Sequence, residues 1–167
     1  MGKSSAYSQE KLIYKQLIHT TMTIAVDFDG TIVEHRYPSI GRELPFATAT
    51  LKKLIDDGHK LILWSVREGE LLQEAVDWCR ERGVRFHAVN GFFDEDSEED
   101  AGDHDKNPHY SRKLKVECFI DDRNVGGLPD WGSIYQIISR HITYEELLAE
   151  QNQDYEEEPK KKPWWKF

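Results

Sequence analysis

The chain has 167 residues, of which 38% are hydrophobic, and its formal net charge is −9. This length suits one domain with terminal extensions, and the hydrophobic content allows a packed core. The acidic balance disfavours general binding to nucleic acid, and no apolar run reaches the about 20 residues of a membrane-spanning helix.

The N-terminus and the two cysteines indicate the compartment. Residues 1–21 lack the apolar stretch of a secretory signal. Cys79 and Cys118 fall inside predicted regular elements, which favours buried free thiols over a disulfide. We therefore expect a cytoplasmic protein with no membrane span and no nucleic-acid partner.

Apolar strands alternate with amphipathic helices along the body of the chain. The predicted strands are Thr23–Asp27, Lys60–Trp64, Arg85–Val89 and Val116–Ile120. The predicted helices begin at Pro45, Gly69, Asp130 and Thr143. Uncharged strands that alternate with helices predict a parallel sheet covered on both faces. The expected fold class is α/β, a Rossmann-like three-layer α/β/α sandwich with a central parallel sheet.

The remaining segments lie outside this alternation. We interpret residues 1–21 as an N-terminal extension, 22–150 as the α/β domain and 151–167 as a charged tail that ends near Trp164-Trp165. Residues 91–108 are dense in Asp and Glu. This acidic loop is interpreted as a solvated connection, with a lid over the site as the alternative.

Polar residues follow three of the predicted strands, at the point where each strand ends. The three sets are Asp27 with Asp29, Ser65 with Arg67, and Asp121 with Asp122. Ligands of open parallel sheets bind beyond the carboxyl ends of the strands. We therefore expect the three sets to converge on one edge of the sheet.

These residue types fit the chemistry of phosphate esters. The Asp27 carboxylate can attack phosphorus to give an aspartyl-phosphate. Asp29 can protonate a leaving oxygen and later deprotonate a water molecule. Gly30 allows the backbone to approach an anion closely, and the hydroxyl groups of Thr31 and Ser65 can donate to it.

Cations are needed where several carboxylates meet a phosphate. Asp121 and Asp122 offer the hard oxygen ligands that Mg²⁺ prefers. The basic candidates for phosphate binding are Lys113, Lys115, Arg67 and Arg123. For Arg67 and Arg123 a surface salt bridge is an equally good interpretation.

Together these motifs resemble the haloacid dehalogenase-like (HAD) superfamily. The sequence DFDGT, Asp27 to Thr31, is similar to the first motif of that family, and LILWS, Leu61 to Ser65, to its second. FIDD, Phe119 to Asp122, is similar to the fourth motif, and Lys113 precedes Asp121 at the spacing of the third-motif lysine in compact members. The resemblance covers roughly residues 23–138 and is greatest to small uncharacterised bacterial proteins described as hydrolases.

The resemblance implies a role for each matched residue. Asp27 would be the nucleophile and a metal ligand, and Asp29 the acid/base with its backbone carbonyl on the metal. Ser65 and Lys113 would hold the phosphoryl group. Asp121 and Asp122 would bind Mg²⁺. An aspartate at position 29 is typical of the phosphatases and phosphomutases of the family.

The family usually gains specificity from a cap domain, and this sequence has no segment suited to one. Residues 30–44 are too few for a folded cap, and residues 90–111 are polar. The expected site is open, which suits a large or extended phosphorylated substrate, or a neighbouring subunit of a homo-oligomer as its lid. We predict a Mg²⁺-dependent phosphatase acting on a phosphate monoester. The alternatives are a non-catalytic HAD-like binding or scaffold protein, and a phosphotransferase or phosphomutase.

Overall fold

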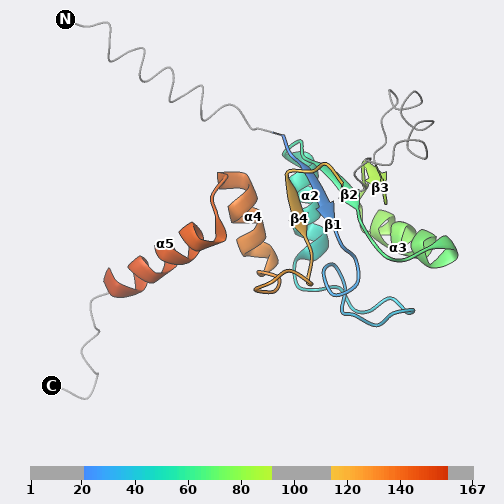
Figure 1. Cartoon of the computed structure of the whole chain (residues 1–167), viewed down its shortest axis with the longest axis horizontal. Coiled ribbons are helices and arrows are strands. Elements are labelled where there is room, and N and C mark those ends of the chain that lie inside the picture. Colours follow the sequence, from blue (N-terminus) through green and yellow to red (C-terminus); the bar gives the residue numbers. More distant parts are fainter. Residues whose placement is uncertain (1–20, 92–113, 158–167) are drawn as a thin grey trace, which may run out of the picture. The chain divides into compact units, whose positions relative to one another are not determined.

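The computed structural model describes residues 21–91 and 114–157, with side chains to residue 152. Contacts within the chain divide it into two compact units, Met1–Leu128 and Pro129–Phe167. In the described residues, the first unit holds a sheet and two helices, and the second holds two further helices (Figure 1). The assignment of residues 22–150 to one α/β domain in the sequence analysis stays a prediction.

The sheet of the first unit has four parallel strands in the order β3-β2-β1-β4. Its strands are β1 (Thr23–Val26), β2 (Lys60–Leu63), β3 (Ala88–Val89) and β4 (Cys118–Ile120). Helix α2 (Ala47–Asp56) connects β1 with β2, and α3 (Gly69–Glu81) connects β2 with β3. The predicted α/β fold with a parallel sheet is confirmed.

The register of the sheet places the ends of all four strands level with one another. Val26 lies opposite both Leu63 and Ile120, and Leu63 lies opposite Val89. One more backbone hydrogen bond beyond β1, from Asp27 N–H to the carbonyl of Ile120 at 2.9 Å, extends the pairing. The residues that follow the strands therefore lie along one edge of the sheet.

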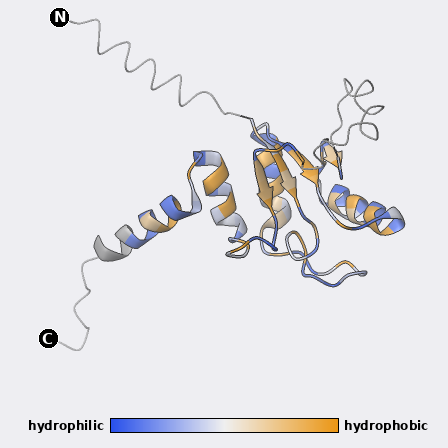
Figure 2. Ribbon diagram, in the orientation of Figure 1, coloured by the Kyte–Doolittle hydropathy of each residue, from blue (hydrophilic) through white to orange (hydrophobic). Residues whose placement is uncertain are grey.

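Apolar side chains on the strands and helices form the core. Both faces of the central strands are buried, since Ile24, Ala25 and Val26 are at most 1% exposed, and successive side chains of a strand point to opposite faces. Figure 2 shows the strands as the most hydrophobic part of the first unit. One cluster on the sheet contains Ala25, Ile62, Ala88 and Leu114, with Trp64 and Val116 packed against it.

Several element boundaries differ from the sequence prediction, among them the starts of α2, β3 and β4, the last of which begins at Cys118 rather than Val116. Helix α2 begins at Ala47 rather than Pro45, because Phe46 has a left-handed backbone (φ 67°) and the Glu43 carboxylate accepts the N–H and hydroxyl of Thr48 at 3.0 and 2.6 Å. Strand β3 is limited to Ala88–Val89, although the sequence predicted a strand over Arg85–Val89.

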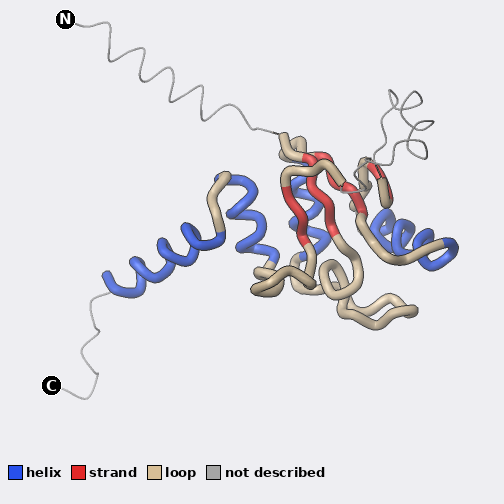
Figure 3. The backbone as a smooth tube through the Cα atoms, viewed as in Figure 1, coloured by secondary structure: helices blue, strands red, loops and turns tan. Residues whose placement is uncertain are grey.

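The loop between β1 and α2 contains a hairpin formed by residues 34–42, called here the 34–42 hairpin (Figure 3). Its arms are joined by the hydrogen bond from Glu34 N–H to the carbonyl of Arg42 at 2.7 Å. Gly41 permits this close approach, since a Cβ atom there would lie 2.0 Å from the carbonyl oxygen of Glu34. The hairpin is further fixed by the Arg42 side chain, which donates to the Glu34 carboxylate.

The second unit contains helices α4 (Trp131–Arg140) and α5 (Tyr144–Glu157). Asp130 caps α4 by accepting the N–H of Ser133 at 3.0 Å. The predicted start of helix α5 at Thr143 is confirmed by a capping box, in which Thr143 Oγ1 accepts the Glu146 N–H at 3.1 Å and the Glu146 carboxylate accepts the Thr143 N–H at 2.7 Å. None of the helices in the described residues is long and apolar enough to cross a membrane.

Candidate metal and phosphate site

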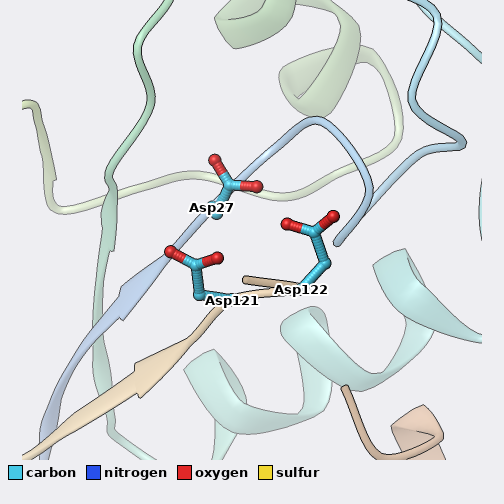
Figure 4. A group of neighbouring side chains, drawn as sticks. All are labelled: Asp27, Asp121 and Asp122. Carbon is cyan, nitrogen blue, oxygen red and sulfur yellow. The ribbon is translucent and has the colours of Figure 1, made fainter. Parts of the chain in front are cut away.

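Three aspartates gather where β1 and β4 end. Asp27 follows β1, and Asp121 and Asp122 follow β4, the neighbouring parallel strand. One carboxylate oxygen from each of the three lies within 4.8 Å of the others, and all three residues are half-buried (Figure 4). The three-aspartate cluster is therefore a direct result of the strand register.

Thr31 links two members of this cluster. Its buried hydroxyl donates to Asp27 Oδ2 at 3.1 Å and accepts the backbone N–H of Asp122 at 3.0 Å. The sequence analysis assigned Thr31 to phosphate binding, which stays a prediction. In the structure its hydroxyl holds the carboxylate of Asp27 and the backbone of Asp122 in a fixed relation.

Gly30 leaves space for the carboxylate of Asp122. Its φ of +95° is in the region that favours glycine, and a Cβ atom there would lie 2.2 Å from Asp122 Oδ2. Gly30, predicted to approach a bound anion, thus lies directly against a carboxylate of the cluster. The absence of a side chain is required at this position for two independent reasons, backbone conformation and space.

Asp122 has an oxygen without a partner. Its Oδ1 atom is buried and makes no hydrogen bond in the described residues. Burying a carboxylate oxygen without a hydrogen-bond donor costs free energy. Two further carboxylates lie in the same cluster, so the surroundings of this oxygen are negatively charged rather than apolar. A cation bound by the cluster would supply the missing partner, and Mg²⁺ takes this type of oxygen ligand. The donor set therefore fits the predicted Mg²⁺.

The electrostatics of Asp27 agree with a shortage of positive charge in the cluster. Burial raises its pKa from 3.8 to about 6, and the charges of Asp121 and Asp122 add to the rise. Hydrogen bonds from the Phe28 backbone and the Thr31 hydroxyl act in the opposite direction. A bound cation would favour the ionised carboxylate.

A pocket of about 180 Å³ opens beside the cluster. A water molecule takes up about 30 Å³ of liquid, so the pocket has the volume of roughly six waters, which is enough for a phosphoryl group. Its lining consists of Asp27, Trp64, Ser65, Val66, Asp121 and Arg123. The predicted nucleophile, hydroxyl donor and one predicted basic residue therefore share one pocket.

Ser65 and Arg123 are held at this pocket by their backbones. The N–H of Ser65 donates to Asn90 Oδ1 at 2.8 Å, and Ser65 Oγ accepts the N–H of Arg67 at 3.2 Å. The N–H of Arg123 donates to Asp121 Oδ1 at 2.8 Å, while its side chain is exposed. Both side chains can therefore face an anion in the pocket without breaking these contacts.

Asp29 and Arg67 form a separate, buried pair. Arg67 Nε donates to Asp29 Oδ2 at 2.6 Å, and Arg67 Nη2 to Asp29 Oδ1 at 2.7 Å. Asp29 is 5% exposed and Arg67 is 0% exposed. The hydrogen bonds with Asp29 raise the pKa of Arg67 further above its usual value. The sequence analysis proposed either a substrate contact or a surface salt bridge for Arg67, and the structure places it in neither position.

No protein-family model and no curated protein matches this chain. The solved structure of a conserved protein from Bacteroides thetaiotaomicron is 58% identical to it, covering 77% of this chain and 98% of that chain with a TM-score of 0.67. The chain belongs to the same family as that conserved protein. At this identity and TM-score the two chains share one fold.

Some predictions of the sequence analysis concern residues outside the described ranges. They are the phosphate-binding Lys113, most of the acidic loop 91–108, Trp164-Trp165 in the tail, and nearly all of the extension 1–21. The backbone carbonyl of Asp29, expected on the metal, lies 3.4 Å from Nδ1 of His35.

Sequence reasoning missed two residues of the site. Trp64 entered the sequence analysis only as the last residue of the predicted strand Lys60–Trp64, yet it both packs on the sheet and lines the pocket. Asn90 was not considered, although it follows a strand as Ser65 does. The position directly after a strand end was the signal common to both residues.

Proposed function

We propose that the protein is a Mg²⁺-dependent phosphohydrolase that acts on a phosphate monoester through an aspartyl-phosphate at Asp27. The observation that carries this proposal is the buried, unpartnered Oδ1 of Asp122 within the three-aspartate cluster. The cluster borders a pocket that also contains a hydroxyl and a guanidinium group. The resemblance of the strand-end motifs to the HAD superfamily supports the same chemistry.

The three-aspartate cluster and two polar residues of the pocket have roles in this proposal. Asp27, Asp121 and Asp122 would hold the ion, which when bound supplies positive charge that offsets the carboxylates and the phosphate. A carboxylate oxygen of Asp27 attacks phosphorus, and the leaving oxygen departs with its electron pair. Ser65 and Arg123 donate to the phosphoryl oxygens, and such charge-assisted hydrogen bonds are strong.

The accessibility of the pocket indicates the size of the substrate. Val66 at its rim is 72% exposed, and Arg123 is exposed. A phosphoryl group can enter while the rest of a large or extended molecule stays outside. The proposed substrate class is therefore a phosphate monoester whose remaining part lies on the surface of the protein.

One observation favours a second candidate, a non-catalytic binding protein of HAD type. Asp29, the acid/base implied by the resemblance, is paired with Arg67 and does not line the pocket. A binding protein needs no acid/base, whereas turnover of most phosphate esters benefits from one. The two candidates differ in whether phosphate is released.

Hydrolysis of 4-nitrophenyl phosphate separates these candidates. We expect release of nitrophenolate in Mg²⁺, loss of release in EDTA, and recovery when Mg²⁺ is added in excess. The reason is that three carboxylates and a phosphate repel one another without a cation. Binding of phosphate without any turnover would support the non-catalytic candidate, and full turnover in EDTA would contradict the role of the metal.

A further inference from the structure

Arg67 is fully buried, although it lies in a loop at the pocket end of β2. The hydrogen bonds donated by its guanidinium group all go to groups inside the protein. Besides the two bonds with Asp29, Nη1 donates to the carbonyl of Pro38 at 2.9 Å and Nη2 to the carbonyl of Ser39 at 3.1 Å. Burying a guanidinium group is costly unless its hydrogen bonds are made, and here they are made.

The guanidinium group joins three segments of the chain. These segments are the loop after β1 through Asp29, the tip of the 34–42 hairpin through two carbonyls, and the loop after β2 to which Arg67 belongs. The rings of Phe28 and Tyr37 lie 5.2 and 5.3 Å from its central carbon. The planar group is thus fixed on its edges and on its faces.

This arrangement restricts the carboxylate of Asp29 to one orientation. Both of its oxygens accept from Arg67, in the two-pronged geometry that gives such pairs their directionality. Along the chain Asp29 lies between Asp27, a member of the three-aspartate cluster, and Gly30, which lies against the Asp122 carboxylate. The orientation of Asp29 relative to the cluster is therefore set by Arg67.

We propose that Arg67 is the positioning residue for Asp29 in proton transfer, an inference that rests on the proposed phosphohydrolase activity. In the second half of that reaction, a water oxygen forms a bond to phosphorus and the bond from phosphorus to Asp27 breaks. The electron pair of the broken bond returns to the Asp27 carboxylate, and the proton of the water passes to Asp29. Asp29 later gives this proton to the next leaving oxygen or to solvent.

The first half of the reaction provides an internal reference. Nitrophenolate is a stable leaving group that departs without a proton, so the attack of Asp27 on 4-nitrophenyl phosphate does not depend on Asp29. Loss of positioning should therefore slow only the hydrolysis of the aspartyl-phosphate. A role for Arg67 that is structural alone would slow both halves together.

The experiment is rapid-mixing kinetics of the full-length Arg67→Lys variant with 4-nitrophenyl phosphate and Mg²⁺. Lysine keeps the charge but cannot form the two-pronged pair. We expect a burst of about one nitrophenolate per protein at the wild-type rate, followed by a steady state slower than wild type by roughly 10–10²-fold, as misplacement of a reacting group can cost. Asp29→Asn should give the same burst with a steady state at least as slow.

Two further variants keep the test decisive. Arg42→Lys changes an exposed arginine of the same hairpin that pairs with Glu34 rather than Asp29, and its kinetics should match wild type. Tyr37→Ala removes a half-exposed ring beside Arg67 and should slow the steady state by a smaller factor, which covers the case in which Arg67→Lys does not fold.

The outcomes separate this inference from the proposed function. Equal slowing of burst and steady state, unchanged kinetics, or a faster steady state in Arg67→Lys would overturn the positioning role while leaving the phosphohydrolase activity in place. If Arg67→Lys does not fold, an unchanged Tyr37→Ala steady state would overturn it. No release of nitrophenolate by the wild-type protein in Mg²⁺ would overturn the proposed function, and the inference with it.

Discussion

Carboxylates lie in two neighbouring regions, the Asp29–Arg67 pair and the three-aspartate cluster, and the two regions differ in how the negative charge is balanced. The Asp29 carboxylate forms an ion pair within the chain, since the Arg67 guanidinium group donates to both of its oxygens. In the three-aspartate cluster, two residues away, no ion pair with a described cationic side chain is formed. The chain thus neutralises the carboxylate that lies away from the pocket and leaves unneutralised those that border it. Charge left unpaired at a pocket indicates a site for an external cation.

Removal of the attacking group tests the cluster most directly. We expect Asp27→Asn to lower the rate of 4-nitrophenyl phosphate hydrolysis by about 10³-fold or more, because the amide cannot form the aspartyl-phosphate. Asp77→Asn, which changes an exposed aspartate of α3 that pairs with Arg80, should keep the wild-type rate. Near-normal turnover by Asp27→Asn would exclude the covalent route.

Neutralising a carboxylate should have opposite effects on stability in the two regions. Asp29→Asn leaves the Arg67 charge buried without its counter-ion, which we expect to lower the free energy of unfolding by about 3–5 kcal/mol. Asp27→Asn removes one of three adjacent unpaired charges, and at pH 7.5 in EDTA we expect it to raise the unfolding temperature. Thermal unfolding of both variants beside wild type measures this contrast.

The pH dependence gives this contrast a second check. Because the pKa of Asp27 is raised from 3.8 to about 6 in the folded protein, the folded state binds more protons between these values. The contribution of Asp27 to stability is therefore fully present below about pH 4 and is lost as the pH rises through 6. The advantage of Asp27→Asn should accordingly disappear near pH 4. An advantage that is equal at both pH values would show that charge is not its cause.

A smaller effect is expected from the glycine beside the cluster. Gly30→Ala introduces a Cβ atom against the Asp122 carboxylate at a φ of +95°, whereas Gly126→Ala places one in open space at a φ of +100°. Both variants carry the conformational cost of about 1 kcal/mol or more. We expect Gly30→Ala to lose roughly 1–2 kcal/mol beyond Gly126→Ala, and to bind Mg²⁺ more weakly by calorimetry. Equal losses and equal Mg²⁺ affinities would show that Gly30 does not shape the cluster.

The sequence predicted the sheet and the three-aspartate cluster because both depend on local patterns. Runs such as Ile24-Ala25-Val26 identify buried strands, and parallel strands bring their carboxyl ends together, so the convergence of Asp27 with Asp121 and Asp122 required no knowledge of packing. The extent of β3 was less predictable, since the expected strand Arg85–Val89 enters the register of β2 only at Ala88 and Val89.

The partners of individual side chains could not be predicted in this way. Arg67 and Asp29 are 38 residues apart, and the Thr31 hydroxyl meets a backbone group 91 residues away. A residue that follows a strand has no periodic pattern to assign its direction, so a buried arginine and an exposed one look alike in the sequence. The burial of Arg67 depends on the tip of the 34–42 hairpin, whose shape is decided by tertiary packing.

The Thr31 hydroxyl, which joins Asp27 to the backbone of Asp122, has a consequence for the kinetics of folding. Contacts between distant parts of a chain carry a large loop-closure cost and limit the rate of folding. The cation site is completed only when β4 has joined β1, so an ion meets its full set of ligands late. A ligand that binds after the rate-limiting barrier stabilises the native state without stabilising the transition state, and it therefore slows unfolding while leaving the folding rate unchanged. Bound metal would therefore lower the rate of unfolding of this protein and leave its rate of folding unchanged.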